Sequence, residues 1–212
     1  SVKQLQQWLK KNGFKRLGRG AFAEAWVKKG EDTVIKISTK EDACWLKYAK
    51  WVRKQKPNKH LPKIHSIRTY DTPDGELFVS RVEKLEEIDN YYEEIDNVIG
   101  TLTDIKVVAE MLWVRSLEYD GENTFQSKAP IMKAMSKSPL RNDPMFKGMG
   151  VPGMISRILS LYQKSPLAIT VRKAHAEILK DTRCFKDLHA GNIMQRKDGT
   201  IVIMDPAAMW GT

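Results

Sequence analysis

The chain of 212 residues is 42% hydrophobic and 29% charged, an ordinary composition for a globular protein with one sizeable core or two small lobes. No stretch approaches the roughly 20 apolar residues that a membrane-spanning helix needs, and residues 1–11 lack the apolar core of a secretion signal. We therefore expect a cytoplasmic protein with no membrane partner. The formal net charge of +10 favours an acidic partner, such as nucleotide phosphates, an acidic protein surface or nucleic acid; a solvated basic surface is the alternative.

The two cysteines, Cys44 and Cys184, are far apart and lack the spacing of metal ligands. Disulfides are rare in cytosolic proteins, so we expect two reduced thiols. The four histidines form no zinc-binding pattern either, and a structural zinc site is therefore not expected.

Taken in chain order, the first 85 residues alternate strand patterns with two helix patterns. An amphipathic helix is followed by a glycine-containing hairpin. A β-branched strand then leads into a second helix, which Ser38 or Thr39 can cap and Pro57 stops. The expected elements are helix 2–11, hairpin 14–29, strand 33–37, helix 41–55, and strands 65–70 and 77–82.

Beyond residue 85 the patterns are mainly helical, and short strands follow near the end of the chain. Residues 118–150 are rich in Gly, Pro, Ser, Asn and Met, so we expect a loop or a loosely ordered insertion there. The expected elements are helices 103–117, 152–163 and 167–180, and strands 184–185, 193–194 and 201–204. Together the patterns predict an α+β protein.

Two features of the first half point weakly to phosphate binding. Gly18 and Gly20 lie at a hairpin tip, where glycines let backbone amides approach phosphates closely. Lys36 lies on the next strand, and a lysine there can pair with phosphate oxygens. Each feature alone also fits an ordinary turn or a solvent-facing lysine.

A third feature carries more weight. The sequence Phe-Lys-Asp-Leu-His-Ala-Gly-Asn-Ile-Met at residues 185–194 is followed by Ile-Val-Ile-Met-Asp at 201–205. Asp187, Asn192 and Asp205 therefore bracket a turn and a hairpin of apolar strands. Their oxygens can converge on one point, where they would form a costly acidic cluster unless a cation is bound. Mg²⁺ with the phosphates of a nucleotide is the natural occupant.

These motifs, in this order, resemble the protein-kinase superfamily, and most closely the small early serine/threonine protein kinases of tailed bacteriophages. Residues 187–192 correspond to the catalytic loop, and Asp205-Pro206-Ala207 takes the place of the metal-binding Asp-Phe-Gly. Gly18 and Gly20 match the glycine-rich loop, and Lys36 matches the phosphate-pairing lysine. The resemblance covers about residues 12–85 and 183–208.

The resemblance implies a bilobal kinase-like fold, with a small β-rich N-terminal lobe at residues 1–85 and a reduced helical C-terminal lobe at 86–212. It implies transfer of the γ-phosphate of ATP, with Mg²⁺ or Mn²⁺, to Ser or Thr hydroxyls of host proteins in the host cytoplasm. Asp187, Lys36 and Asn192 would be catalytic, and Asn192 and Asp205 would hold the metal. The nucleotide would contact the glycine loop, the lysine and the hinge at Gly18, Arg19, Gly20, Ala21, Phe22, Lys36, Glu83 and Leu85.

Two departures from the family pattern and one unassigned pairing leave alternatives open. Phe185 and Lys186 replace the usual His-Arg, and His189 replaces the usual Lys, as in small-molecule kinases of the aminoglycoside type. The acid that pairs with Lys36 is either Glu41 or Asp42. A small-molecule kinase with an acidic pocket from residues 86–96, and a non-catalytic binding module, are therefore the alternatives to a protein kinase.

Basic residues dominate residues 3–68 and again 128–180, whereas acids dominate 83–122. We expect the second basic stretch to recruit an acidic protein substrate, and nucleic acid is the less favoured partner. Loss of the basic side chains in this stretch should weaken phosphorylation of such a substrate, and the residues concerned are Lys128, Lys133, Lys137 and Arg141.

Overall fold

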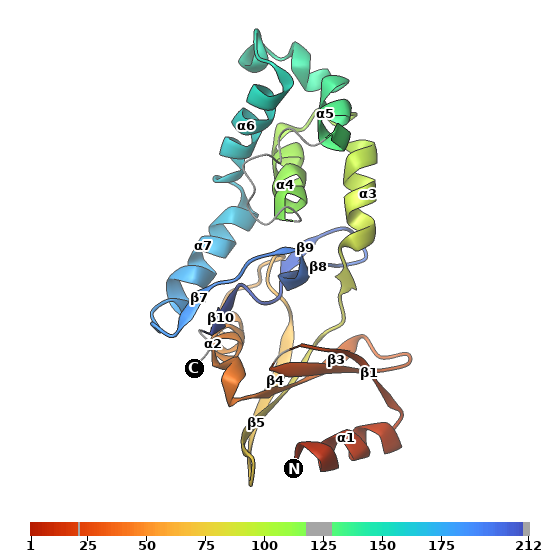
Figure 1. Cartoon of the computed structure of the whole chain (residues 1–212), viewed down its shortest axis with the longest axis vertical. Helices are drawn as coiled ribbons and strands as arrows, with labels where there is room; N and C mark the ends of the chain where they lie inside the picture. Colours follow the sequence, from red (N-terminus) through yellow and green to blue (C-terminus); the bar gives the residue numbers. More distant parts are fainter. Residues whose placement is uncertain (21, 118–128, 210–212) are drawn as a thin grey trace.

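A computed structural model gives the structure of the chain, and it describes residues 1–20, 22–117 and 129–209. An antiparallel sheet at the N-terminal end is followed by a mostly helical region, so the predicted α+β class is confirmed (Figure 1). No helix among these residues is both long and apolar enough to cross a membrane.

The N-terminal sheet has five antiparallel strands in the order β1-β2-β3-β5-β4. The strands predicted in this half are confirmed, each within a few residues of its expected bounds. The tight turn between the last two depends on Gly75, whose φ of 106° is strained for any residue with a side chain. The strands are β1 (Phe14–Arg19), β2 (Ala23–Lys28), β3 (Thr33–Thr39), β4 (Ile64–Thr72) and β5 (Gly75–Glu83).

Alternation along β3 gives the two faces of the sheet different partners. Ile35 and Ile37 face helix α1 (Val2–Lys11), where Leu9, Trp26 and Leu77 complete a small hydrophobic cluster. Lys36 points to the opposite face, toward helix α2 (Ala43–Val52). The predicted first helix has the bounds expected from its periodicity.

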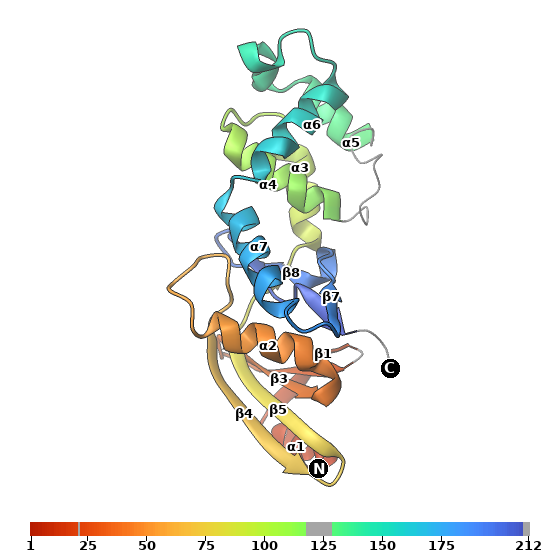
Figure 2. The same ribbon diagram turned by 90° about the vertical axis from the view of Figure 1, so that its left-hand side faces the viewer.

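Helix α2 begins later and ends earlier than the sequence predicts. Residues Lys40–Asp42 form a 3-10 turn, and neither Ser38 nor Thr39 caps α2: its N-cap is Asp42, which makes no side-chain capping bond. The turn places Asp42 beside the sheet instead of leaving it in solvent. Helix α2 itself lies between the sheet and helix α7 (Pro166–Ile178), as Figure 2 shows.

In the described part of the second region, five α-helices share a core with α2 and the C-terminal strands. The expectation of a loosely ordered insertion is wrong for residues 129–150, because Ile131, Met135, Leu140 and Phe146 are buried; residues 118–128 lie outside the described chain. Helix α3 in the acidic stretch was not predicted. Its many charged residues obscure in the sequence the helical spacing of the buried residues Ile88, Tyr92, Ile95 and Ile99. The helices are α3 (Asp89–Val98), α4 (Ile105–Ser116), α5 (Ala129–Ser136), α6 (Val151–Tyr162) and α7.

Short strands near the C-terminus hold the predicted motif residues in place. Strand β7 pairs with β10, and β8 lies between β6 and β9. Strands β6 and β10, which have two and three residues, were not predicted, since such short pairings depend on partners distant in sequence. The strands are β6 (Glu86–Glu87), β7 (Cys184–Lys186), β8 (Ile193–Gln195), β9 (Ile201–Ile203) and β10 (Ala207–Met209).

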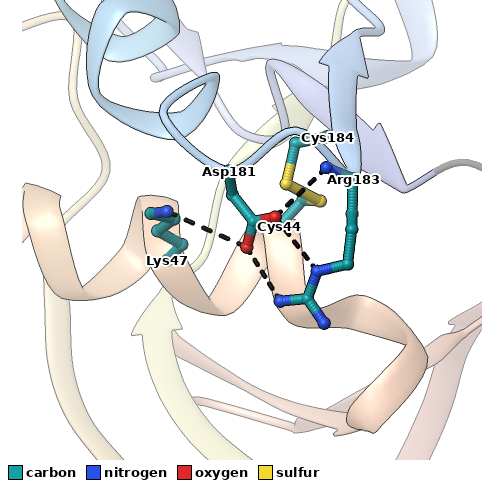
Figure 3. Close-up of a disulfide and its surroundings, with 5 residues drawn as sticks. All are labelled: Cys44, Lys47, Asp181, Arg183 and Cys184. Atoms are coloured by element: carbon teal, nitrogen blue, oxygen red, sulfur yellow. Dashed lines mark hydrogen bonds and ion pairs between the residues drawn. A yellow bond between two sulfur atoms is a disulfide. The ribbon is translucent and has the colours of Figure 1, made fainter.

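The expectation of two reduced thiols is wrong. Cys44 on α2 and Cys184 on β7 form a disulfide, with their Cα atoms 5.8 Å apart (Figure 3). The same helix is tied to the turn before β7 by Lys47, which lies 3.9 Å from Asp181. Hydrogen bonds from the Arg183 side chain and backbone hold the pKa of Asp181 well below its usual range. Sequence spacing cannot reveal this bond, because 140 residues separate the two cysteines.

We predict that the disulfide stabilises the fold measurably. A cross-link over 140 residues lowers the entropy of the unfolded chain, which is worth about 4 to 5 kcal/mol in the chain-entropy model. Dithiothreitol should therefore lower the melting temperature by roughly 10 °C. The double variant Cys44→Ser/Cys184→Ser should melt at the lower temperature whether or not the reductant is present. If the wild-type melting temperature does not change with the reductant and the native protein has two titratable thiols, the Cys44–Cys184 disulfide is contradicted.

Candidate functional site

Lys36 lies between two aspartates. Its Nζ is 3.0 Å from Asp42 Oδ2 and 3.6 Å from Asp205 Oδ2. It also lies 3.7 Å from the centre of the Trp45 ring, a cation–π contact with the first turn of α2. The choice left open by the sequence is thus settled in favour of Asp42. Glu41 instead has its pKa lowered mainly by a hydrogen bond from the Thr39 side chain.

A 3-10 turn at Ala190–Asn192 arranges the predicted catalytic loop. Asn192 donates from Nδ2 to the carbonyl of Asp187 at 2.5 Å and approaches its carboxylate at 3.3 Å. The amide of Gly191 donates to His189 Nδ1, and the His189 ring lies so close that a side chain at position 191 would collide with it. The loop therefore holds Asp187 and Asn192 side by side, and a side chain at position 191 would displace the His189 ring.

Asp205 is anchored to that loop through the backbone. Its amide and that of Met204 both donate to the carbonyl of Asn192. One residue later, the carbonyl of Pro206 accepts hydrogen bonds from the amide of Asp187 and from Nε2 of His175. These bonds fix the relative positions of the three motif residues. Burial lowers the pKa of His175, which keeps the ring neutral with its proton on Nε2.

The electrostatics of Asp205 indicate a place for a cation. Desolvation raises the pKa of its carboxyl to about 7; Lys36 opposes the rise, and Asp42 and Asp187 add to it. Its Oδ1 atom is buried and has no hydrogen-bond partner within the described chain. An unpartnered carboxylate oxygen facing other acids is the environment that a bound cation would relieve.

The described residues contain no group of three His, Cys, Asp or Glu side chains preorganised as a metal site. This does not exclude Mg²⁺, which commonly takes only one or two protein carboxylates and completes its shell with phosphate oxygens and water. Asn192 and Asp205 supply that type of donor set. The residues present therefore fit a nucleotide-bound cation better than a metal held by the protein alone.

Two neighbouring cavities are built from these elements. The first, of about 240 Å³, is called the polar cavity for the charged residues in its lining. It contains the predicted residues Gly20, Phe22, Lys36, Asp187, Asn192 and Asp205, together with Glu41, Asp42 and Cys44. The other, of about 450 Å³, is mainly apolar and is lined by Leu17, Gly18, Ala25, Glu87, Ile88, Ala190, Gly191, Ile193 and Met194. The glycine hairpin contributes to both, through Gly20 and Gly18 respectively.

The structure does not bring every predicted residue to these cavities. The amide of Gly20 donates to the carbonyl of Ala23, which closes the hairpin turn, and Arg19 lines a separate small cavity beside α1. Ala21 lies outside the described residues. Glu83 and Leu85 line neither cavity: Glu83 is paired with Arg196, and its amide donates to Lys63.

Glu87 and Ile88, two and three residues beyond Leu85 of the predicted hinge, line the apolar cavity instead. Sequence reasoning missed them because β5 extends to Glu83 and β6 pairs with β8. The apolar residues of β8, Ile193 and Met194, follow directly after Asn192 and could have been chosen from that position. The sequence matches no protein-family model and no curated protein.

We predict that Asp205→Asn stabilises the metal-free protein increasingly as pH rises. The folded-state pKa of about 7 exceeds the unfolded value of 3.8, so wild-type stability falls as pH rises through this interval and then levels off. The variant removes this dependence, and its gain in melting temperature over the wild type should grow between these two values. Thermal melts in a chelator would measure it.

Asp74→Asn provides the control, because the same change is made in an exposed turn. It should leave the pH dependence of stability as in the wild type. A difference between Asp205→Asn and the wild type that is constant with pH would contradict the assigned environment of Asp205.

Proposed function

We propose that this protein is a kinase that uses ATP and a divalent cation to transfer the γ-phosphate to a hydroxyl group of a protein. The single observation that carries the proposal is the position of Lys36 between Asp42 and Asp205, in one cavity with Asp187 and Asn192. These are a phosphate-pairing lysine with its carboxylate partner, a candidate base and two candidate metal ligands, which is the set of groups that phosphoryl transfer uses.

The proposal includes a two-lobed, kinase-like arrangement. The sheet with α1 and α2 would form the nucleotide-covering lobe, and the helical region would form the second lobe. In support, one cavity is lined both by Lys36 of β3 in the sheet and by Asp187 and Asp205, which follow β7 and β9 near the C-terminus. A nucleotide would then be enclosed between the two.

The two cavities suggest how ATP would bind. The apolar cavity offers Ala25, Ile88 and Ile193 to a flat adenine ring, and Glu87 and Ile88 of its lining would supply backbone hydrogen-bond partners. The polar cavity offers Lys36 to the phosphates. This assignment moves the proposed adenine contact from Glu83 and Leu85 to residues 87 and 88.

A divalent cation fits the acidic excess of the polar cavity. Lys36 faces the carboxylates of Glu41, Asp42, Asp187 and Asp205 there. Asn192 and Asp205 would hold Mg²⁺ or Mn²⁺, which when bound neutralises charge that develops on the phosphates. Asp42 would orient Lys36 through their ion pair. The Asn192 carbonyl, which accepts from the Asp205 amide, would hold Asp205 in position to bind the metal.

Asp187 would orient the acceptor hydroxyl and accept its proton. Its backbone is fixed on both sides, by donation to Pro206 and by the hydrogen bond from Asn192, and its carboxylate remains partly exposed. The exposed His189 ring lies 3.9 Å from this carboxylate and would contact the acceptor rather than the nucleotide. Catalysis would come mainly from positioning and electrostatic stabilisation.

The positions of the acidic side chains at residues 86–96 favour a protein acceptor over a cationic small molecule. The small-molecule alternative needs residues 86–96 to form one acidic pocket. Asp96 is instead paired with Arg115 at 2.9 Å, and Glu93 and Glu94 are exposed on α3. Glu87 alone among the described acids of this stretch lines the apolar cavity.

We predict that the protein transfers label from γ-labelled ATP to protein bands of a bacterial lysate when Mg²⁺ or Mn²⁺ is present. Asp187→Asn should lower this rate by at least about a hundredfold, because the candidate base is removed without a change in volume. Asp198→Asn, in an exposed turn, is the matched control and should transfer normally. Label found only on small molecules would favour the small-molecule kinase, and no transfer with either metal would contradict the proposed activity.

We also predict that ATP raises the melting temperature only together with Mg²⁺ or Mn²⁺, because the ligand binds the folded state alone. Lys36→Ala should reduce this ligand-induced rise, since its ammonium group pairs with the phosphates. Lys29→Ala, at an exposed turn, should leave the rise unchanged. An equal rise without metal, or in Lys36→Ala, would count against the assigned phosphate site.

A further inference from the structure

A third cavity, of about 760 Å³, lies at the far end of α2 from the candidate site. Its apolar floor is formed by Val52, Leu61, Pro62 and Ile64. Its rim carries the exposed cations Arg53, Lys56, Lys59 and Lys63, which are called the basic rim below.

The loop that carries this rim is fixed by several hydrogen bonds. Asn58 donates to the Thr170 hydroxyl on α7 at 2.9 Å, and the side chain of His60 bonds to the carbonyl of Ile201 on β9. Arg196 donates to the carbonyls of Lys59 and Leu61. The backbone of the loop that carries the basic rim is therefore held in place before any ligand arrives, which lowers the entropic cost of binding.

The cations that line this cavity differ in whether a carboxylate neutralises them. Arg196 is neutralised by Glu83, whose Oε1 lies 2.7 Å from its NH2. In contrast, none of the four rim cations forms an ion pair with a carboxylate in the described part of the chain. Like charges gathered on one fixed loop repel one another, so an anionic ligand would relieve a cost that the folded protein carries.

The basic side chains of the second basic stretch, residues 128–180, are less concentrated than those of the basic rim. Lys133 and Lys137 share a cavity with Asp96, Arg141 donates to the carbonyl of Ser136, and Lys128 lies outside the described residues. The basic rim is thus the better candidate for the acidic partner that the net charge predicts.

We propose that the basic rim and its apolar floor bind an acidic peptide segment of the protein substrate. Carboxylates of such a segment would meet the four cations, and its apolar side chains would contact Leu61 and Ile64. The lining contains no Phe, Tyr or Trp, and His65 supplies its one aromatic ring, which disfavours single-stranded nucleic acid, because its bases bind mainly by stacking on several aromatic side chains. The role as a substrate dock rests on the proposed kinase function; the binding itself does not.

The position of the dock sets a requirement on the substrate. Helix α2 starts next to Asp42 and ends at Val52, so its ten residues separate the two sites by about 15 Å. A substrate bound at both would need at least about five extended residues between its acidic segment and the accepting hydroxyl.

The test measures fluorescence anisotropy of a short labelled peptide in which acidic residues alternate with leucine, titrated with the full chain without ATP. The variant Arg53→Gln/Lys56→Gln/Lys59→Gln/Lys63→Gln should bind it at least about tenfold more weakly at low salt, and added salt should shrink the difference. A matched control, Lys3→Gln/Lys10→Gln/Lys11→Gln/Lys29→Gln, also removes four exposed positive charges and should bind as the wild type does.

A melting curve accompanies each variant, and the milder Lys56→Gln/Lys59→Gln pair, expected to show an intermediate loss, replaces the fourfold variant if that one does not fold. Equal binding by the basic-rim variant and the wild type would overturn the proposal, as would an equal loss in the matched control. If a labelled oligonucleotide binds more tightly than the peptide through the same four residues, the proposed acidic peptide is wrong and the ligand is nucleic acid. Since no ATP is present, failure of phosphoryl transfer would leave this result intact and would refute only the kinase function.

Discussion

The ion pairs of Lys36 with Asp42 and Asp205 are the interaction on which the candidate site depends. Bringing these charges together partly out of water is costly unless each is compensated. One lysine neutralises only part of the negative charge around it. Burial raises the pKa of Asp205, the nearby Asp42 and Asp187 add to the rise, and the Oδ1 atom of Asp205 has no hydrogen-bond partner within the described chain. A bound cation with phosphates would balance both the acids and the lysine. This charge arrangement is the main support for the proposed ligand.

Helix α2 connects this arrangement with the surrounding structure. Its first turn holds Trp45 against Lys36, and Cys44 links it covalently to β7, three residues before Asp187. Farther along, the buried hydroxyl of Tyr48 donates to the carbonyl of Ile203, two residues before Asp205. Its last turn reaches the basic rim. Displacement of α2 would therefore change the Lys36 environment, the proposed catalytic loop and the proposed dock together.

Sequence reasoning located most elements and the polar half of the site, but not the contacts between distant segments. Strands such as β3 carry a β-branched pattern, and Lys36, Asp187, Asn192 and Asp205 belong to motifs with fixed spacing, so local information was sufficient. The Cys44–Cys184 bond and the cavity residues Glu87 and Ile88 depend on how separate segments pack, which no local pattern specifies. The choice between Glu41 and Asp42 depended on a 3-10 turn where a regular helix was expected.

The most direct test of the central claim is a crystal structure of the protein with Mg²⁺ and a non-hydrolysable ATP analogue. We expect the phosphates beside Lys36, the metal on Asn192 and Asp205, and the adenine in the apolar cavity between Ala25 and Ile193. A nucleotide bound elsewhere, or a metal that contacts neither Asn192 nor Asp205, would contradict the proposed site.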